Sequence, residues 1–340
     1  LSKYQKEIEN IINKEGFIEP KERRNEIISF VKKGLKDFSI SRTNLTWGIP
    51  VPDKSDHTFY VWFDALLGYV SALTKSISSG WPASLHLIGK DILRFHAIYW
   101  PAMLLSAGMA PPTKIIGHGF LTREGQKMGK SLGNVLDPDL LLEKYGEDAV
   151  RWFLLKDILL GSDGDFQHKR FVDIVNNDLA NTIGNLLNRT TSMSRKWFNK
   201  SVPDVSNNKE VILSELSKKM IKEYINYFNN NQLDLASNLV LNYAIKINLY
   251  LNENEPWSLI KNDESIDEVK IIIYNVLESI RIIGLLLNPL LPNLSNKIDN
   301  QLGKLYKNDQ PWINQLEWGL TPEGNELPSP IPIITKLEYE

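Results

Sequence analysis

Two lysines lie three residues apart in a glycine-punctuated segment, Gly-Gln-Lys-Met-Gly-Lys-Ser at 125–131. An apolar run at 114–122 precedes the segment and is typical of a strand. Asp137 and Pro138 follow it and predict the N-cap and first turn of a helix. Ammonium groups and backbone N–H donors at a strand end suit a polyphosphate. We therefore predict that this segment, with its lysines Lys127 and Lys130, binds a polyphosphate.

This segment has two other interpretations, a P-loop and an ordinary surface turn. A P-loop requires its first glycine at position 124, but Glu124 stands there and Gly125 comes one residue too late. The four-residue span that wraps a phosphate is therefore missing. The second interpretation is an ordinary surface turn rich in Gly and Lys, so other segments of the chain must decide.

Several further motifs resemble one family, in its order along the chain. Lys-Met-Gly-Lys-Ser resembles the Lys-Met-Ser-Lys-Ser loop of class I aminoacyl-tRNA synthetases, with Gly129 in place of a serine. The other segments resemble methionyl-tRNA synthetases: Trp-Gly-Ile-Pro-Val at 47–51, Phe-Tyr-Val-Trp-Phe-Asp-Ala-Leu-Leu-Gly-Tyr at 59–69, Leu-Ile-Gly-Lys-Asp-Ile-Leu-Arg-Phe-His at 87–96, Asn-Leu-Leu-Asn-Arg at 185–189 and Glu-Pro-Trp at 255–257. The resemblance covers nearly the whole chain.

Composition limits the classes of site and partner. With 340 residues the chain has room for two domains with cores of their own. It has no cysteine and five widely spaced histidines, so we expect no zinc or other metal site. No stretch of 18 apolar residues occurs, so we expect no membrane span. The net charge of −2 does not predict a polyanion partner, so tRNA binding would need a local basic face.

The predicted fold class is α/β plus all-α: the second half of a doubly wound parallel nucleotide-binding sheet, followed by an antiparallel helix bundle. Residues 1–40 have the spacing of two short amphipathic helices. Strands are predicted at 57–63, 84–88 and 114–121, with helices at 64–79 and 91–108 after the first two. A ligand should bind at the carboxyl ends of such strands.

Helical periodicity dominates the second half of the chain. We predict two helices after Asp137, broken near Gly146, and then long helices at 172–198, 208–230, 232–253, 264–288 and 293–304. The apolar segment at 285–292 should be the buried centre, and the tail at 328–332 should be extended. By resemblance, residues 1–45 are the tail of a connective insertion, 46–170 the C-terminal half of the catalytic domain, and 171–340 an anticodon-binding bundle with a C-terminal tail.

The resemblance implies that ATP binds at the strand ends and the lysine loop. Amino-acid activation builds charge on phosphate oxygens, so Lys130, which matches the second lysine of the family's signature, would neutralise departing pyrophosphate, with Lys127 as a secondary candidate. Gly89 would allow adenosine to approach, and Asp91 would accept from ribose hydroxyls, although from sequence alone Asp91 suits a helix N-cap. Mg²⁺ should enter with ATP. The predicted ATP-binding residues are His86, Gly89, Asp91, His118, Gly119, Met128 and Lys130.

The resemblance also supplies a methionine pocket. A thioether side chain needs an apolar site with few polar groups. Tyr69 and His96 each offer it a weak hydrogen bond, while Leu66 replaces a proline of some family members. Without the family, ordinary core packing would be the better interpretation of these residues. The predicted methionine-binding residues are Trp62, Leu66, Tyr69, Phe95, His96 and Trp100.

Three residues in the bundle match the family's anticodon readers. Asn185 and Arg189 are four residues apart and share a helix face, and Trp257 follows Pro256 in a link between helices. An indole with an amide and a guanidinium nearby suits stacking and reading of unstacked bases. A buried tryptophan with a surface arginine is the alternative.

The function implied is that of a methionine–tRNA ligase, which makes methionyl-adenylate from ATP and methionine and transfers the methionyl group to tRNA(Met). We expect a monomer, no membrane partner, and a location in the cytoplasm or an organelle stroma or matrix. The family's N-terminal half, with its His-Ile-Gly-His-type ATP motif, has no counterpart here, so we expect this fragment alone to be an incomplete enzyme. The alternative is a non-catalytic tRNA-binding fragment or module.

Overall fold

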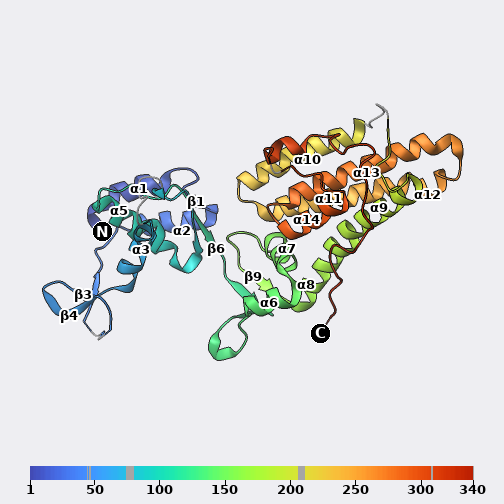
Figure 1. Ribbon diagram of the computed structural model, residues 1–340. Coiled ribbons are helices and arrows are strands. Elements are labelled where there is room, and N and C mark those ends of the chain that lie inside the picture. The colour runs from blue at the N-terminus through green and yellow to red at the C-terminus, as the bar shows by residue number, and fades with distance from the viewer. Residues whose placement is uncertain (44, 46, 74–79, 206–210, 308, 340) are drawn as a thin grey trace. The chain divides into compact units, whose positions relative to one another are not determined.

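The chain folds into two compact units (Figure 1). Unit 1 comprises Leu1–Phe120 and Leu160–Asp163, and unit 2 comprises Leu121–Leu159 and Gly164–Glu340. The computed structural model describes residues 1–340 except 44, 46, 74–79, 206–210, 308 and 340, and the side chains of Lys130 and Val211 also lie outside the described part. Because residues 160–163 return to unit 1, the chain passes between the units after residues 120, 159 and 163.

Unit 1 is built on a parallel sheet with the strand order β1-β6-β5. The strands are β1 (Ile18–Glu19), β6 (Ile115–His118) and β5 (His86–Gly89). The helices α1 (Gln5–Asn13) and α2 (Lys21–Val31) confirm the two predicted amphipathic helices. Their apolar faces, which include Ile8, Ile12 and Ile27, share one core with Ile88 and Ile115 of the sheet. The first 35 residues therefore belong to the core of unit 1.

The strand predicted at 57–63 is misplaced. The structure has β4 (Lys54–Phe59) in a separate antiparallel sheet of order β2-β4-β3, with β2 (Ser41–Arg42) and β3 (Pro50–Val51). Asp53 has a φ of 62° and turns the chain sharply between β3 and β4, so β4 pairs locally. The helix α3 (Val61–Ser71) begins three residues before the predicted start at 64 and ends at Ser71, so the prediction of one helix over 64–79 is wrong; residues 74–79 lie outside the described part.

The helix predicted at 91–108 consists of three consecutive helical segments. A 3₁₀ turn (Lys90–Ile92) follows β5, and a π-helix (Phe95–Tyr99) leads into α5 (Trp100–Ser106). The strand predicted at 114–121 is likewise divided. β6 ends at His118, and β7 (Leu121–Arg123) begins a different sheet in unit 2.

Unit 2 opens with a β-hairpin. β7 pairs antiparallel with β8 (Gln126–Lys127) and parallel with β9 (Gly164–Phe166). The two predicted helices follow as α6 (Pro138–Tyr145) and α7 (Glu147–Asp157). Asp137 caps α6, since its carboxylate accepts from the backbone N of Asp139 at 2.9 Å. Gly146, at a φ of 80°, separates the two helices as predicted.

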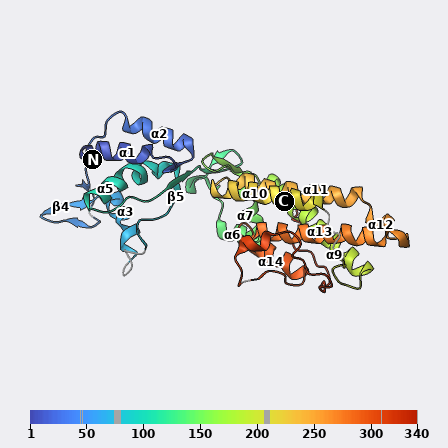
Figure 2. The same cartoon turned by 90° about the horizontal axis from the view of Figure 1, so that it is seen from above.

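The remainder of unit 2 is the predicted helix bundle (Figures 1 and 2). One helical run comprises α8 (His168–Ile174), a π-helix (Val175–Gly184) and α9 (Asn185–Trp197). Next come α10 (Val211–Asn229), α11 (Leu233–Glu253), the short α12 (Pro256–Leu259), α13 (Ile266–Leu287) and α14 (Pro292–Gln301). Their bounds confirm the predictions to within a few residues, apart from 208–210, which lie outside the described residues.

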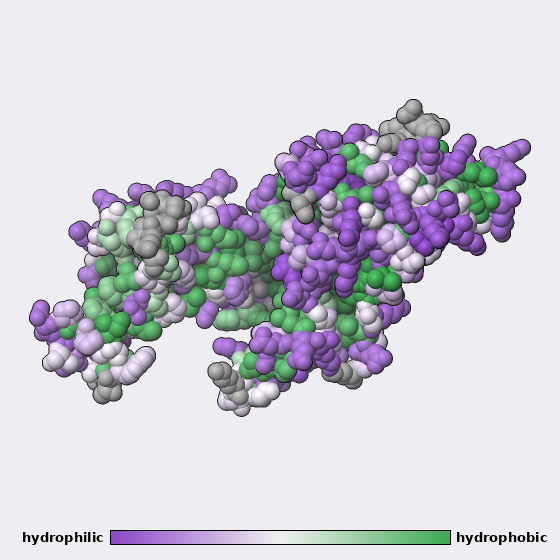
Figure 3. Space-filling view, viewed as in Figure 1, coloured by the Kyte–Doolittle hydropathy of each residue, from purple (hydrophilic) through white to green (hydrophobic). Residues whose placement is uncertain are grey.

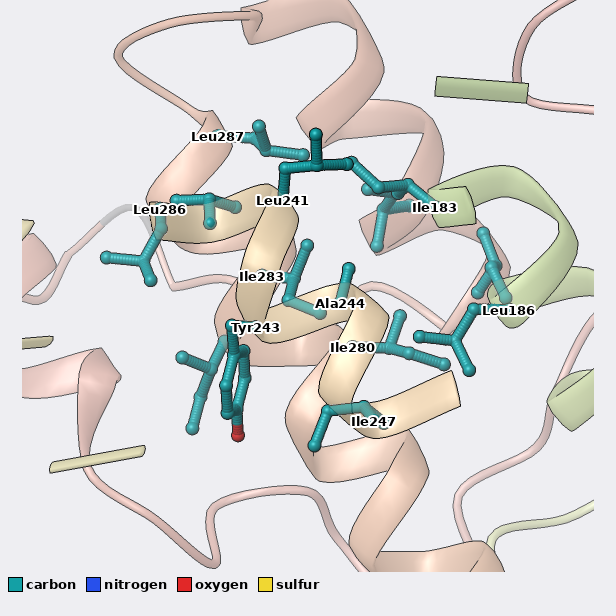
Figure 4. Close-up of a cluster of buried hydrophobic side chains, with 14 of the residues drawn as sticks. Ile183, Leu186, Leu241, Tyr243, Ala244, Ile247, Ile280, Ile283, Leu286 and Leu287 are labelled. Carbon is teal, nitrogen blue, oxygen red and sulfur yellow. The ribbon is translucent and has the colours of Figure 1, made fainter. Parts of the chain in front are cut away.

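Apolar side chains of α9, α11 and α13 interlock in the bundle core (Figure 4). Ala244 and Ile247 of α11 and Ile280 and Ile283 of α13 are fully buried there. Leu285–Leu287, Leu290 and Leu291 are also buried, whereas Pro289 and Pro292 are exposed, so the prediction of a buried centre at 285–292 is confirmed for its leucines only. The bundle exterior is largely hydrophilic in Figure 3. No helix in the described part of the chain is long and apolar enough to cross a membrane.

The C-terminal tail runs along the bundle in an extended form. Lys297 Nζ donates to the Ile333 carbonyl at 3.1 Å, and the backbone N of Leu337 donates to Asn176 Oδ1 at 2.8 Å. These contacts join the tail to α14 and to the helical run at 168–197, so the tail is part of the bundle's folded structure.

Candidate functional site

Three predicted ATP-binding residues meet at the carboxyl ends of β5 and β6. Gly89 and His118 are register partners on these parallel strands. A Cβ built on Gly89 would lie 2.7 Å from Asp91 Oδ1 and 3.9 Å from His118 Cε1, so any larger residue would crowd Asp91. Asp91 and His118 are both exposed. The strand ends therefore leave an open position where a ligand can approach backbone, carboxylate and imidazole together.

Gly119, another predicted ATP-binding residue, is packed against the segment 160–163. A Cβ on Gly119 would overlap the Ser162 carbonyl, so only glycine fits at this approach. Asp163 fixes the same segment, since it accepts from the backbone N of Phe120 at 2.8 Å and from Lys90 Nζ at 2.6 Å. The hydrogen bond from Lys90 is the main reason that the pKa of Asp163 is lowered. Lys90 and Asp163 were not predicted.

Tyr69 and His96 form a hydrogen bond within an aromatic cluster. Tyr69 Oη lies 2.8 Å from His96 Nε2, and His96 Nδ1 lies 3.0 Å from the Ile92 carbonyl. A carbonyl can only accept, so Nδ1 carries the proton and Nε2 of the neutral ring accepts from Tyr69. Burial lowers the pKa of His96, which favours this neutral form.

The other predicted methionine-binding residues surround this pair. Trp62 stacks on Phe95 with ring centroids 4.3 Å apart, and Trp100 lies 6.2 Å from Tyr69. Leu66 is buried in the same small core as Trp100. Phe95 and His96 lie in the π-helix, a form of helix that is frequent at functional sites. The structure thus brings together all six residues of the predicted pocket.

His86 lies in the aromatic cluster, at the opposite end of β5 from Gly89. Its ring is 4.4 Å from Tyr69 and 5.9 Å from His96. Burial, followed by the neighbouring His96, lowers the pKa of His86 to about 4, so the ring is neutral at pH 7. Its buried Nε2 has no hydrogen-bond partner among the described residues. Contact between His86 and ATP stays a prediction.

Trp81 belongs to the same cluster and was not predicted. Its ring centroid lies 5.7 Å from Trp100 and 6.2 Å from His86. Its Nε1 donates to the Ala110 carbonyl at 2.8 Å, which fixes the ring. In the sequence, the Trp-Pro dipeptide at 81–82 indicates only the boundary of a helix or strand. Nothing local therefore predicts that Trp81 contacts Trp100 and His86.

The signature loop, defined here as residues 127–131, extends from the β7–β8 hairpin. Glu124 and Gly125 form the hairpin turn with φ values of 50° and 73°, the pattern of a type I′ turn. A one-turn 3₁₀ helix begins at Lys130, and the next helix starts only at Pro138. A P-loop would lead directly into a long helix, so this geometry, like Glu124, disfavours a P-loop.

Of the predicted ATP-binding residues in the loop, the structure describes the side chain of Met128 but not that of Lys130. The sulfur of Met128 accepts from the backbone N of Leu136 at 3.4 Å, so this side chain points back toward the start of α6. The side chain of Lys130 lies outside the described part. The roles of Lys127, Met128 and Lys130 in binding ATP stay predictions.

The three predicted anticodon-binding residues lie on one side of the bundle in unit 2. The Arg189 guanidinium is 5.5 Å from the centroid of the Trp257 ring, and its Nη2 donates to Asn252 Oδ1 at 3.0 Å. The Trp257 side chain keeps 36% of its surface exposed. Asn185 is exposed one helical turn before Arg189 on α9.

Backbone geometry presents Trp257 to solvent. Glu255 has a φ of 41°, in the left-handed region, and directs the chain from α11 into the single-turn helix α12. Asn252, which holds Arg189, was not predicted, because its contact with α9 joins residues 63 positions apart. Indole, guanidinium and amide groups therefore lie close enough to contact one unstacked nucleotide strand.

The described residues contain no group of three or more His, Cys, Asp or Glu side chains that could hold a metal ion.

Comparison with known proteins agrees with both halves of the structure. A family model described as tRNA synthetases class I (M) matches residues 1–191, and one described as the anticodon binding domain of methionyl tRNA ligase matches residues 202–340. The methionine–tRNA ligase of a Nostoc species is 46% identical over 362 residues, covering 99% of this chain and 67% of the relative. The chloroplastic/mitochondrial methionine–tRNA ligase of Arabidopsis thaliana is 45% identical over 355 residues, covering 99% of this chain and 57% of that protein.

Solved structures give the same result. Mycobacterium tuberculosis methionyl-tRNA synthetase in complex with methionyl-adenylate matches with a TM-score of 0.90 and 37% identity, covering 98% of this chain and 67% of that one. The free form of the same synthetase matches with a TM-score of 0.88 and 35% identity, covering 100% of this chain and 68% of that one. The predicted fold class is confirmed. This chain spans about two thirds of the length of most of these proteins, and it belongs to the methionyl-tRNA synthetases, the methionine–tRNA ligases of class I.

Proposed function

We propose that this chain carries the methionine pocket, part of the ATP site and the anticodon-binding surface of a methionine–tRNA ligase. One observation carries the proposal: the four-residue strand β5 joins two sites. His86, at its start, lies in the aromatic cluster, and Gly89, at its end, lies beside Asp91 and His118. A methionine side chain in the cluster and an adenosine at the strand end would be neighbours, as adenylate formation requires.

The chemistry assigned to this chain is positioning and charge stabilisation. A methionine carboxylate oxygen bonds to the α-phosphorus of ATP as the bond to the bridging oxygen of the β-phosphate breaks, and pyrophosphate leaves with that electron pair. The Lys130 ammonium, assisted by Lys127, would neutralise the charge on the leaving pyrophosphate. ATP would enter as its Mg²⁺ complex, with the ion held chiefly by phosphate oxygens.

The second half of the reaction needs tRNA(Met), which the bundle would hold. Trp257 offers a stacking face, while Asn185 and Arg189 offer hydrogen-bond donors to the CAU anticodon. The pocket and the anticodon surface each lie within one unit, so neither requires a second copy of the chain. We place the activity where translation occurs, in the cytoplasm or in an organelle stroma or matrix.

The test is methionine-dependent ATP–pyrophosphate exchange by the complete enzyme, meaning this chain together with the remaining third present in its relatives. Lys130→Ala should lose roughly 2–4 kcal/mol of transition-state stabilisation while the methionine KM stays nearly constant. Lys219→Ala is a matched control, because Lys219 is an exposed lysine on α10. Exchange by Lys130→Ala within about threefold of wild type would exclude this role.

A second candidate is a tRNA-binding fragment without catalysis of its own. It is favoured by the open edge of the parallel sheet: β5 is an edge strand, and its Leu87 side chain is 62% exposed. Apolar side chains also reach the surface of unit 1 in Figure 3. Among the described residues no strand pairs with the outer side of β5, and an edge strand presents backbone N–H and C=O groups to another strand, so this edge suits a further strand. Exchange by the chain alone, compared with the chain plus the remaining third, separates the two candidates.

A further inference from the structure

The side chain of Asn134 bridges two backbone groups of the signature loop. Its Oδ1 accepts from the backbone N of Gly129 at 2.9 Å, and its Nδ2 donates to the Lys127 carbonyl at 3.2 Å. Gly133, at a φ of 62°, turns the chain back so that Asn134 reaches these groups. One amide therefore joins the peptide units on both sides of Met128, as a partner strand would.

Other side-chain hydrogen bonds hold the hairpin before the loop and the chain after it, and the Asn134 bridge lies between them. At the base, Asp165 Oδ1 accepts from the backbone N of Gly125 and from Thr122 Oγ1, each at 2.8 Å. Past the loop, the Leu136 backbone N donates to the Met128 sulfur. Ser131 at the end of the signature loop is exposed, and so is Leu132 directly after it.

We propose that Asn134 is a positioning residue for the activation step. Its amide fixes the backbone from Lys127 to Gly129, so that the turn beginning at Lys130 meets the phosphates in one conformation. A loop that samples several conformations places its ammonium groups correctly for only a fraction of the time. The reaction rate is then reduced in proportion to that fraction. Asn134 does not touch the reacting atoms in this assignment, which rests on the function proposed above.

The kinetic test uses the complete enzyme and pyrophosphate exchange. Asn134→Ala removes both hydrogen bonds, so kcat should fall about tenfold, as the loss of one to two net hydrogen bonds implies. The methionine KM, the melting temperature and binding of an anticodon stem-loop should be unchanged. Asn181→Ala is the control, since Asn181 is an exposed asparagine elsewhere in unit 2. A parallel loss of melting temperature and stem-loop binding would show a general structural role and overturn the proposal.

Limited trypsin digestion of the chain itself tests the bridge without catalysis. Cleavage after Lys127 and Lys130 should be about tenfold faster in Asn134→Ala than in wild type, because the bridge no longer opposes local opening. Asn134→Asp keeps an acceptor for Gly129 but no donor for Lys127, so its cleavage rate should be intermediate. Equal cleavage of all three proteins would overturn the proposal. A wild-type enzyme without exchange would refute the proposed function, while the digestion would still test the bridge.

Discussion

Replacing Tyr69 with phenylalanine removes one hydroxyl from the aromatic cluster and should measurably destabilise unit 1. The hydroxyl donates to His96 Nε2 at 2.8 Å, and His96 is only 1% exposed. A buried acceptor that loses its donor costs about 1–3 kcal/mol. The phenylalanine ring keeps the packing against His86, 4.4 Å away, so no cavity term is added. The free energy of opening unit 1 should therefore fall by about 1–3 kcal/mol.

Hydrogen exchange of unit 1 peptides in this chain measures the opening free energy for each unit separately, which a single unfolding curve does not. Tyr60→Phe is the control, since the stacking of Arg42 on that ring, at 3.8 Å, needs no hydroxyl. In the complete enzyme, Tyr69→Ala should also raise the methionine KM and leave the ATP KM nearly unaltered. The reasoning fails if Tyr69→Phe changes unit 1 no more than the control does. Equal rises in both KM values would indicate general packing instead of contact with methionine.

Three further predictions concern the anticodon surface, the signature loop and pH. Trp257→Ala should weaken aminoacylation of tRNA about tenfold or more and leave adenylate formation intact, because one stacked base is worth about 1–3 kcal/mol; equal affinity of the wild-type chain for CAU and non-CAU stem-loops would contradict this. Gly129→Ser should be tolerated and exchange at least as fast as wild type, since Gly129 lacks a positive φ and its Cβ would meet Leu132 at 3.6 Å; slower exchange would show that glycine is required. Because the pKa of His86 is about 4 when folded and 6.5 unfolded, the unfolded chain binds more protons between these values, so stability should fall by roughly 1–2 kcal/mol on acidification from pH 7 to 4. His86→Gln should reduce that loss, as the opening free energy of unit 1 from hydrogen exchange at the two pH values would show.

The bundle could be predicted from sequence almost helix by helix. Its apolar residues recur at helical spacing, and prolines or glycines stand at its boundaries: Gly146 separates α6 from α7, and Pro292 begins α14. The sheets were harder, because strand pairing is a long-range property. The apolar residues before Trp62 fitted a strand, but nothing local shows that β4 pairs with a hairpin partner. β1 has two residues, too few to show any periodicity.

In the candidate site, too, residues within local motifs could be predicted, whereas contacts between distant segments could not. Tyr69 and His96 could be predicted because each stands in a motif, at 59–69 and at 87–96, that resembles a family. Contacts that support the strand ends and the hairpin were missed because each joins distant segments: Asp165 holds a turn 40 residues earlier, and Lys90 pairs with Asp163, 73 residues later. Asn134 was within reach of sequence reasoning, since Gly133-Asn134 is a turn-forming pair directly after the signature loop.

The return of residues 160–163 to unit 1 has a consequence for how the protein responds to a protease. A cut in the signature loop would yield a fragment from Leu1 to the cut and a second fragment from the cut to Glu340. The first fragment would retain β7, which pairs with β9 of the second, and the second would retain Asp163, which binds Lys90 and Phe120 of the first. Each fragment would contribute residues to both units, so neither unit would be complete in one fragment alone. A nicked molecule should therefore elute as one species under native conditions and separate only in denaturant.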